Sequence, residues 1–392
     1  MELTAEPLHP ATGRLRVALD ATPLLTPRSG VGEFCYWAMA ALAARGDMDV
    51  NAFAVSWRRR EGLVGQVPEG VSVTGRPMPA RPLHKSWSMW PLPPIEAFVG
   101  RVDIVHGTNF VVPPARRAAM VVTVHDLTPL HFPQMCQAAT LAFPDLVRKA
   151  VARGAWVHTP TQFVADEVVH YLGVPAARVK AVHHGIPSAG LGPYSPPLQG
   201  QGESWRGYVP PWVERYVLAM STIEPRKDFP GLVRAFDRLA PSHPGVALVI
   251  AGADGWGAEA LDKSIATAGL PERVLRLGRV TDQARGSLLE GASAFAYPSV
   301  YEGFGLPPLE AMAAGTPVVA TSAGALVETL GDSALFVSQG DTEQLSGALE
   351  EVLDRPQVAE DLRRRGYLQA SKYSWAACAK GLADLYRLSV EK

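Results

Sequence analysis

The chain of 392 residues is long enough for two or three domains, since a typical domain holds about 100–200 residues. With 47% hydrophobic and 19% charged residues it can bury large cores, and this composition excludes an intrinsically disordered protein. The formal net charge of −1 lacks the basic excess that is typical of nucleic-acid-binding proteins, so we expect no nucleic-acid partner.

Short apolar runs, rich in β-branched residues, alternate with helical patterns in the first half of the chain. Runs of this kind indicate β-α-β units around a parallel sheet. The predicted strands are residues 15–19, 50–55, 104–105, 120–124, 156–159 and 179–182. The alternation stops between Pro187 and Trp212, where six prolines and five glycines predict a linker or a long surface loop.

The same alternation resumes after Trp212. The predicted strands are residues 216–220, 246–251, 274–277, 294–297, 317–320 and 334–337, with helices between them such as 229–239 and 283–291. The sequence therefore predicts an α/β fold with two domains in tandem, and ligands should bind at the carboxyl ends of the strands. Neither half carries the G-x-G-x-x-G pattern after its first strand, and the nearest approximations begin at Gly30 and Gly252. This argues against a nicotinamide-dependent dehydrogenase.

The segment from Pro298 to Ala320 carries the strongest chemical signal. A predicted strand leads into a glycine-containing loop and then into a short helix, whose first N–H groups are suited to bind a phosphate or sugar hydroxyls. Glu302 lies in the loop, and Glu310 lies eight positions later within the first turns of the helix. Both carboxylates can therefore face one pocket, and a carboxylate can accept both hydroxyl groups of a sugar diol.

These paired glutamates and their surroundings, PSVYEGFGLPPLEAMAAGTPVVA, resemble the signature of the retaining nucleotide-sugar glycosyltransferases of family 4. The resemblance implies the GT-B fold, in which two Rossmann-like domains face each other across a cleft. It places an acceptor-binding domain at residues 1–205, a nucleotide-sugar-binding domain at 209–374 and a helix at 375–392 that crosses back to the first domain. Further matching blocks are Asp20 with the loop at 30–32 and the segments 103–107, 123–126, 159–163, 185–186, 224–227, 277–280 and 322–328.

The resemblance also assigns the donor-binding residues of the second domain. Glu302 is expected to hold hydroxyls of the donor sugar, and Glu310 is expected to hold the ribose of the nucleotide. The loop and the start of the helix are expected to contact the donor through their backbone, at Gly303, Phe304, Gly305 and Leu306.

Two cations, Arg226 and Lys227 of the EPRK block, are expected to grip the diphosphate. Their charge is worth most in the transition state, because negative charge grows on the diphosphate as the glycosidic bond breaks. The chain departs from the family pattern at two places: Thr222 stands where many members have an arginine, and Asp228 stands where the EPRK relatives have an asparagine. The resemblance implies that Arg226 takes the place of the missing arginine.

In the first domain, Gly30 and Gly32 are predicted to form a loop before a helix that begins near Glu33, beside the diphosphate and the acceptor. His125 and Asp126 follow a predicted strand, and the resemblance places them at the donor sugar and the acceptor. The family implies a front-side displacement, in which the departing phosphate takes the acceptor proton. His125 is therefore interpreted as a lining residue of the catalytic site and not as a base.

No metal ion and no cofactor are expected, because GT-B enzymes hold the diphosphate with helix dipoles and cations. Asp47 and Asp49 match the D-x-D pattern of another glycosyltransferase fold, but they precede a strand and have no further ligand nearby in the sequence, so we interpret them as a surface turn. The cysteines, Cys35, Cys136 and Cys378, are too far apart for a metal knuckle or a disulfide framework. His106, His183 and His184 are interpreted as structural.

Residues 56–101 hold seven Lys and Arg residues, three Asp and Glu residues and three tryptophans, Trp57, Trp87 and Trp90. This mixture is typical of a peripheral membrane contact, and the alternative is an acceptor-side loop that packs on its own domain. Apolar runs of the roughly 18 residues needed to cross a bilayer are absent, and the first residues lack the pattern of a signal peptide. We expect a cytoplasmic protein, either free or on the inner face of the membrane.

The resemblance implies transfer of a hexose with retained configuration from a nucleotide sugar to a glycan or lipid-linked acceptor. GDP-mannose is the expected donor because the EPRK block is similar to that of mannosyltransferases, and a UDP-glucose-type donor is the alternative. Two other classes stay open: a sugar-nucleotide 2-epimerase with the GT-B fold, and a donor-binding subunit without turnover.

Overall fold

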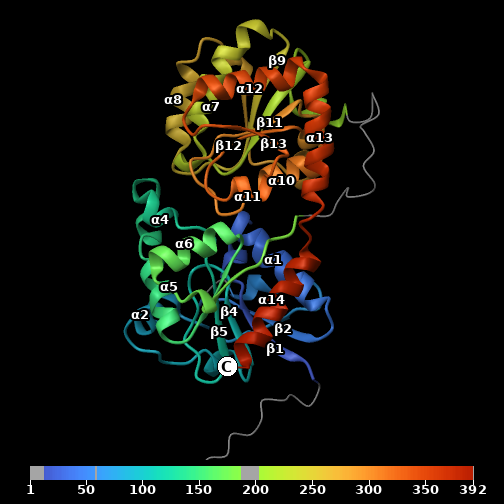
Figure 1. Ribbon diagram of the computed structural model, residues 1–392. Helices are drawn as coiled ribbons and strands as arrows, with labels where there is room; N and C mark the ends of the chain where they lie inside the picture. The colour runs from blue at the N-terminus through green and yellow to red at the C-terminus, as the bar shows by residue number, and fades with distance from the viewer. Residues whose placement is uncertain (1–12, 58–59, 187–202, 392) are drawn as a thin grey trace, which may run out of the picture. The chain divides into compact units, whose positions relative to one another are not determined.

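The computed structural model describes residues 13–57, 60–186 and 203–391. The chain forms two compact units (Figure 1). The first unit contains the residues up to Gly185 together with those from Trp375 onward, and the second contains Ile186–Ser374. Among the described residues none of the helices is long and apolar enough to span a membrane.

The first unit is built on a seven-stranded parallel sheet with the strand order β3-β2-β1-β4-β5-β6-β7. The strands are β1 Leu15–Asp20, β2 Met48–Phe53, β3 Ser72–Val73, β4 Ile104–Gly107, β5 Ala119–Thr123, β6 Trp156–Thr159 and β7 Val179–Ala181. The helices are α1 Gly30–Ala43, α2 Ala80–Met89, α3 Glu96–Val99, α4 Thr128–His131, α5 Phe143–Ala152, α6 Gln162–Leu172 and α14 Trp375–Val390.

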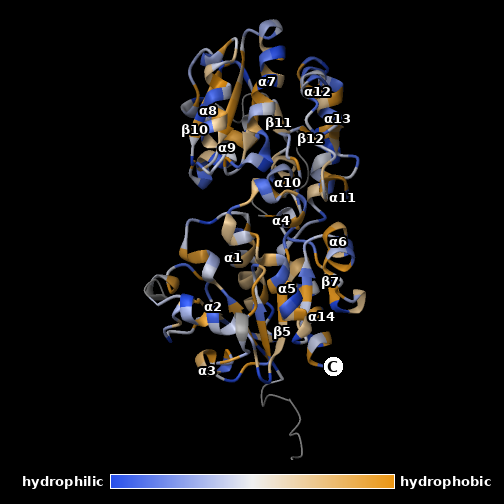
Figure 2. Ribbon diagram, turned by 90° about the vertical axis from the view of Figure 1, so that its left-hand side faces the viewer, coloured by the Kyte–Doolittle hydropathy of each residue, from blue (hydrophilic) through white to orange (hydrophobic). Residues whose placement is uncertain are grey.

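Both faces of this sheet are covered by helices, as a parallel sheet requires. Successive side chains of a strand point to opposite faces, so Val17 and Leu19 of β1 join α1 and α14 in one core, whereas Ala18 joins α5 and α6 in another. Figure 2 shows the result, with hydrophobic strands such as β5 inside the unit and polar residues on the outer helices.

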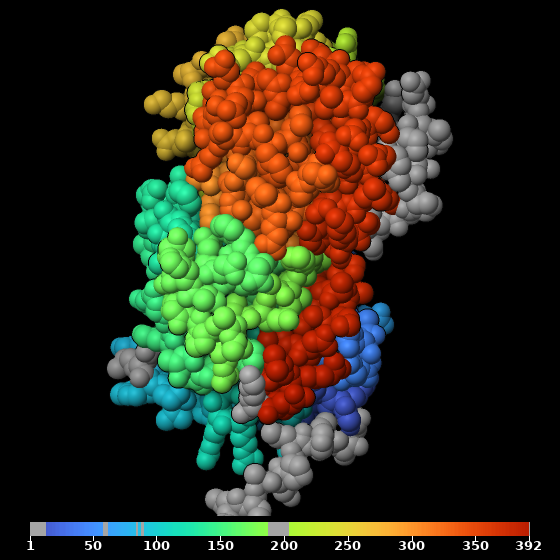
Figure 3. All heavy atoms as spheres, in the orientation of Figure 1, coloured from blue at the N-terminus to red at the C-terminus, as the bar shows by residue number. Residues whose placement is uncertain are grey.

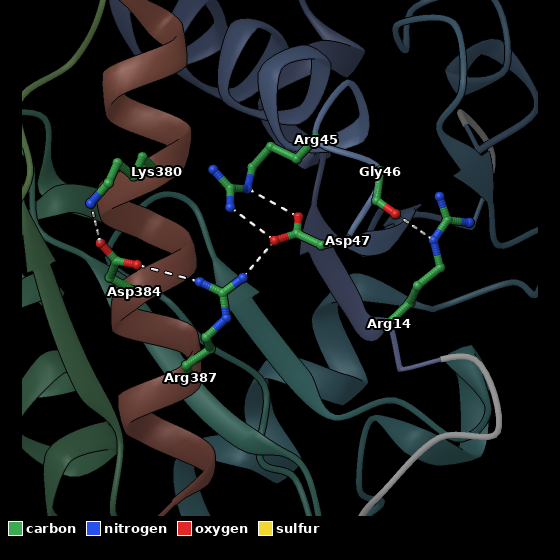
Figure 4. Close-up of polar contacts among 7 residues, drawn as sticks. All are labelled: Arg14, Arg45, Gly46, Asp47, Lys380, Asp384 and Arg387. Atoms are coloured by element: carbon green, nitrogen blue, oxygen red, sulfur yellow. Dashed lines mark hydrogen bonds and ion pairs between the residues drawn. The ribbon is translucent and has the colours of Figure 1, made fainter.

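Helix α14 belongs to the first unit although it ends the chain, and it lies beside α1 (Figure 1). On the face seen in Figure 3, its red surface lies between the blue and green segments of the same unit. An ion pair fastens it there, because Arg387 lies 2.5 Å from Asp47, just before β2 (Figure 4). Arg387 also pairs with Asp384 on its own helix. Asp47 also accepts from Arg45, and these arginines lower the pKa of its carboxyl.

The second unit is built on a six-stranded parallel sheet with the order β10-β9-β8-β11-β12-β13. The strands are β8 Arg215–Met220, β9 Val246–Ala251, β10 Val274–Gly278, β11 Ala294–Tyr297, β12 Val318–Thr321 and β13 Ala334–Val337. The helices are α7 Phe229–Leu239, α8 Ala258–Ala266, α9 Asp282–Gly291, α10 Leu306–Ala313, α11 Leu326–Leu330, α12 Thr342–Asp354 and α13 Pro356–Ala370. The predicted α/β class with two parallel sheets is confirmed.

The boundary between the units lies earlier than the predicted position near residue 205. The short helix Glu203–Tyr208 packs on α9 of the second unit, and its Trp205 is 8% exposed within that unit's core. The packing is close enough that a Cβ atom added to Gly291 would lie 2.2 Å from the Trp205 ring. This aromatic anchor, which the proline- and glycine-rich composition around it conceals, draws the segment into the second unit.

The strand order of each sheet reverses next to its first strand. In the first unit the reversal lies between β1 and β4, and in the second it lies between β8 and β11. At such a point the loops that follow the two neighbouring strands run in opposite directions and leave a crevice between them. Open α/β sheets bind their ligands in this crevice. The loops after β1, β4 and β5 and those after β8 and β11 are therefore the ones that position a site in each unit.

Candidate functional site

In the second unit, the loops after β8 and β11 bring three predicted residues together. Lys227 Nζ lies 2.5 Å from Glu302 Oε1, and Arg226 Nη1 lies 2.8 Å from Glu302 Oε2. Lys227 Nζ also donates to the hydroxyl oxygen of Tyr297, the last residue of β11, at 2.7 Å. Glu302 thus holds both cations of the EPRK block at one point on the carboxyl edge of the sheet.

The electrostatics of this cluster follow from its burial. Burial alone raises the pKa of Glu302, but the charges of Arg226 and Lys227 outweigh it and lower that pKa to about 2. Burial, together with the neighbouring Arg226, lowers the pKa of Lys227. Glu224 adds a second carboxylate, 3.7 Å from Arg226. The group therefore combines two cations with two carboxylates, arranged around an ionised Glu302.

The backbone holds the two loops of this cluster against each other. Arg226 donates from its guanidinium to the carbonyl of Tyr301, and its own carbonyl accepts from the N–H of Val300. Asp228, the residue that departs from the family's asparagine, has a φ of 44° and accepts from the N–H of Gly231 to cap α7. Aspartate and asparagine both tolerate this left-handed conformation and both cap helices, so the substitution preserves the local fold.

The loop from Glu302 to Leu306 and the loop after β12 each contain a position that only glycine allows. Gly305 has a φ of 90°, and a Cβ atom there would lie 2.6 Å from a methyl carbon of Leu326. Gly324 has a φ of 58°, and a Cβ atom there would lie 2.3 Å from the carbonyl oxygen of Glu302. The glycines let two loops approach closely and so fix where Glu302 points.

The structure of this loop shows how Phe304 and Leu306, two of the predicted donor-binding residues, are placed. The Phe304 side chain is buried and packs edge-on against Tyr373, so its predicted contact with a donor rests on the backbone alone. Leu306 is the first residue of α10, and Gly303 precedes Phe304 in the same loop. The short helix that follows carries Glu310 in its second turn.

The carboxylate of Glu310 forms an ion pair with Arg285 of α9. Arg285 and Tyr297 are site residues that were not predicted from the sequence. For Tyr297 a signal existed, because it ends a predicted strand at the carboxyl edge. For Arg285 the sequence offers only its place near the start of a helix, since its partner lies 25 positions away.

In the first unit, His125 follows β5 and lies in an aromatic setting. Its Nε2 is 2.8 Å from the carbonyl oxygen of Thr108, which can only accept, so Nε2 carries a proton. Burial lowers the pKa of His125, and the neutral ring keeps its lone pair on Nδ1. The ring centroid is 5.3 Å from that of Phe34 of α1 and 5.6 Å from that of His184.

Asp126 follows His125 in the sequence, and the two glycines lie at the start of α1, the helix that carries Phe34. Asp126 accepts from the N–H of Thr128 at the start of α4. Gly30 and Gly32 lie inside the first turn of α1, so the prediction of a loop before a helix near Glu33 was wrong. A Cβ atom would meet nothing within 4 Å at Gly30, and at Gly32 its nearest contact would be an ordinary 3.4 Å.

Two further buried histidines of the first unit, His106 and His158, belong to a chain of hydrogen bonds. The carbonyl of Val182 accepts from His158, so the proton directions follow in sequence: Tyr386 donates to His106 Nδ1, His106 Nε2 to Thr123, and Thr123 to His158 Nδ1. Burial lowers the pKa of both imidazoles, to about 3 for His158. The chain links α14 to β4, β5 and β6 through neutral rings.

Asp47 and Asp49 are engaged by arginines, Asp47 as described above and Asp49 by Arg14 at 3.1 Å. Within the described part of the chain, His243, Glu350 and Asp354 have potential ligand atoms within 4.8 Å of one another. His243 precedes β9, so this group lies at the amino edge of the second sheet, opposite Lys227 and Glu302.

The three tryptophans of residues 56–101 differ in their surroundings. Trp87 is 6% exposed and donates from its indole to the carbonyl of Pro93, so this tryptophan fits the packing alternative and not the membrane contact. Trp57 and Trp90 are 57% and 64% exposed. Arg58 and Arg59, also part of that prediction, lie outside the described residues.

Comparison with known proteins identifies both halves of the chain. The family described as Glycosyltransferase Family 4 matches residues 28–189, and the family Glycosyl transferases group 1 matches residues 210–369. O-antigen chain mannosyltransferase B of Escherichia coli is 29% identical over 79% of this chain and 79% of its own. O-antigen chain mannosyltransferase RfbU of Salmonella typhimurium is 25% identical over 84% of this chain and 89% of its own.

Solved structures share the fold. Sucrose-phosphate synthase from Thermosynechococcus elongatus has a TM-score of 0.75 at 20% identity, covering 96% of this chain and 99% of its own. HepE from Anabaena, in complex with UDP and glucose, has a TM-score of 0.72 at 20% identity, covering 95% of this chain and 99% of its own. With the two parallel-sheet units and the two matching families, the chain belongs to glycosyltransferase family 4 and is a hexosyltransferase with the GT-B fold.

Proposed function

We propose that this enzyme transfers mannose from GDP-mannose, with retention of configuration, to a glycan or lipid-linked acceptor. The observation that supports it most is the cluster of Arg226, Lys227 and Glu302, which concentrates two cations at one point of the site. The names of the two relatives reported above, both O-antigen mannosyltransferases, favour mannose as the sugar.

The cluster suits the departure of a nucleoside diphosphate. Lys227 and Arg226 face growing negative charge on the leaving group, and buried cations stabilise such charge more strongly than cations in water. Glu302 keeps both cations in place and, in this proposal, accepts hydroxyl protons of the donor sugar. Glu310 holds the ribose, so the two carboxylates act on different ends of the same donor.

His125 contributes a hydrogen-bond acceptor to this reaction. Because its Nε2 proton is directed to Thr108, only the Nδ1 lone pair is available for a sugar or acceptor hydroxyl. Gly30 and Gly32 place no side chain of their own in the first turn of α1, and neither glycine is required by contacts within the protein. We therefore assign both to close approach of the donor diphosphate, and Gly30 with Asp126 to the acceptor.

The proposal includes no metal ion and no cofactor, because Lys227 and Arg226 supply the positive charge that the leaving group needs. A UDP-glucose-type donor is the second candidate, and the HepE structures with UDP and with UDP-glucose favour it. A 2-epimerase and a subunit without turnover, the two other classes that the sequence left open, are not proposed, because the chain belongs to a family of hexosyltransferases. The protein would work in the cytoplasm, at the inner face of the membrane if the acceptor is a lipid.

A panel of nucleotide sugars, tested by thermal shift and then by turnover, separates these candidates, because a ligand that binds the folded state raises its stability with concentration. GDP-mannose should give the largest shift and release GDP only when an acceptor extract is present. A larger shift in melting temperature with UDP-glucose would make UDP-glucose the donor in place of GDP-mannose. Conversion of the sugar without an acceptor, or binding without any turnover, would contradict the proposal.

A further inference from the structure

We propose that Arg285 is a positioning residue that holds the Glu310 carboxylate for recognition of a ribose diol. The inference rests on the proposed function, since it concerns how the nucleotide of the donor is bound. It adds a residue from α9, outside the glycine loop and outside the EPRK block, to the donor site.

The ion pair joins two helices whose starts are fixed. Thr281 caps α9 by accepting from the N–H of Ala284, and the N–H of Arg285 donates to the carbonyl of Thr281 at 2.8 Å. Helix α10 starts after Gly305, whose conformation is fixed as described above. Arg285 and Glu310 thus extend from well-defined backbone positions, with side chains that are 30% and 11% exposed.

The geometry of the pair leaves most of the carboxylate available. An ionised carboxylate offers about four lone-pair sites on its two oxygens, and a cis-diol needs two of them. Arg285 contacts Oε2 of Glu310, which leaves Oε1 to a ligand. A carboxylate that is nine-tenths buried also needs a charged partner, because burial of an uncompensated charge is costly.

The position of the pair makes its effect specific to the ribose. The guanidinium of Arg285 is paired with Glu310, whereas Arg226 and Lys227 are both paired with Glu302. Loss of Arg285 therefore frees the Glu310 carboxylate to rotate and leaves the diphosphate cations in place. Binding of a nucleotide that lacks the diol should be nearly unaffected.

Calorimetric titration tests this on the full-length protein with GDP, UDP and their 2′,3′-dideoxy counterparts. For the nucleotide that the unmodified protein prefers, Arg285→Gln should weaken binding about tenfold, as expected for loss of a charge-assisted contact. Binding of the dideoxy nucleotide should change less than about twofold, because no diol is present to be held. Arg285→Lys, which keeps the charge but loses the planar fork, should restore part of the loss.

A double-mutant cycle isolates the pair. In a Glu310→Gln background, Arg285→Gln should have almost no further effect, because the two residues act as one unit. The matched control is Arg276→Gln, which removes another partly exposed arginine that pairs with Asp254 and Asp262 in the same unit. This control should leave the binding of both the ribose and the dideoxy nucleotide unchanged. Melting temperatures establish that each variant is folded.

The outcomes separate the two levels of the proposal. If the unmodified protein binds neither ribonucleotide, the proposed function fails. If it binds one of them, the inference is tested by how Arg285→Gln and Arg285→Lys change nucleotide binding. Equal weakening of the binding of the ribose and dideoxy nucleotides, or tighter binding of the ribose nucleotide, would show that Arg285 does not position Glu310. Only this inference would then be overturned. Tighter binding would show that Arg285 competes with the nucleotide for the carboxylate.

Discussion

Lys227 Nζ and Glu302 Oε1 lie 2.5 Å apart, with side chains that are only 8% and 7% exposed. This buried pair, together with Arg226, joins the loop after β8 to the loop after β11. Removal of one member of such a group is costly, because it leaves the others buried with unbalanced charge. The same residues therefore contribute to the fold of the second unit and to the chemistry assigned to it.

Lys227→Ala should lower kcat by about 100-fold or more and raise KM less, because the lysine charge is needed most as the diphosphate departs. Steady-state kinetics measures both parameters, with whichever donor the panel of nucleotide sugars identifies. Lys263→Ala, on the exposed surface of α8, is the matched control and should change neither. A variant with normal kcat and only a raised KM would show that Lys227 binds the donor without assisting its departure.

Glu302→Ala and Glu310→Ala should separate the two ends of the donor. Loss of Glu310 should weaken the free nucleoside diphosphate, since the ribose is held there. Loss of Glu302 should spare the free nucleotide, because Lys227 and Arg226 stay and lose a competing anion, but it should weaken the intact sugar nucleotide. Calorimetry with both ligands checks this, and equal losses in the two variants would contradict the division of roles.

Catalysis should survive chelation. In the proposed donor site the carboxylate of Glu302 is already paired with Arg226 and Lys227, and Asp47 and Asp49 are paired with arginines elsewhere. Activity measured before and after EDTA treatment should differ by less than about twofold if no catalytic metal is bound. Loss of activity that magnesium or manganese restores would contradict the proposal. His243→Ala would then test the group at the amino edge of the second sheet.

The first unit should lose stability as the pH falls below about 6.5, the ordinary pKa of histidine. Burial lowers the pKa of His158 to about 3 and that of His106 in the same direction, so the unfolded state binds more protons in this window. Each such histidine contributes roughly 1.4 kcal/mol per pH unit to the free energy of unfolding, which rises with pH through the window.

Urea unfolding between pH 7 and pH 5 measures this slope. His158→Gln should reduce the slope by about one proton, because it removes one titrating group and keeps a hydrogen-bonding side chain. Tyr386→Phe, which removes the donor to His106 Nδ1, should destabilise the first unit by about 1–3 kcal/mol at pH 7. An unchanged slope in His158→Gln would show that this ring does not control the acid sensitivity.

Most strands could be predicted from the sequence because they are buried apolar runs, and the predicted strands of both sheets correspond to observed ones. The two residues of β3, Ser72–Val73, are too few to give a pattern. The start of α1 was misplaced because Gly30 and Gly32 have low helix propensity, although the first turn of a helix tolerates glycine. Local composition also concealed Trp205, which joins the second core by packing and not by pattern.

Only those residues of the candidate site that lie in short local motifs could be predicted from the sequence. Glu302, Glu310 and Lys227 lie in short local motifs, which a sequence displays directly. The Arg285–Glu310 pair joins residues 25 positions apart, and the Lys227–Glu302 pair joins residues 75 positions apart. Pairings at such distances depend on strand order and helix packing, which the one-dimensional pattern does not specify.

The two exposed tryptophans give the last prediction. If the acceptor is a membrane lipid, Trp57 and Trp90 should enter the interface, where indole rings are preferred, and basic residues nearby should add about 1 kcal/mol each. Flotation with anionic vesicles should then be strong at low salt and weak at high salt, because the Debye length falls from about 30 Å at 0.01 M to about 3 Å at 1 M.

The double variant Trp57→Ser, Trp90→Ser should lose most of this flotation while binding the donor nucleotide normally. Trp212→Ser, which removes a 41% exposed tryptophan from the second unit, is the matched control and should float like the unmodified protein. Trp87 is unsuitable for the test, since its burial means that substitution would disturb the core. If the unmodified protein fails to float at low salt, the acceptor is better sought among soluble glycans, and the two exposed tryptophans become candidates for stacking on its sugar rings.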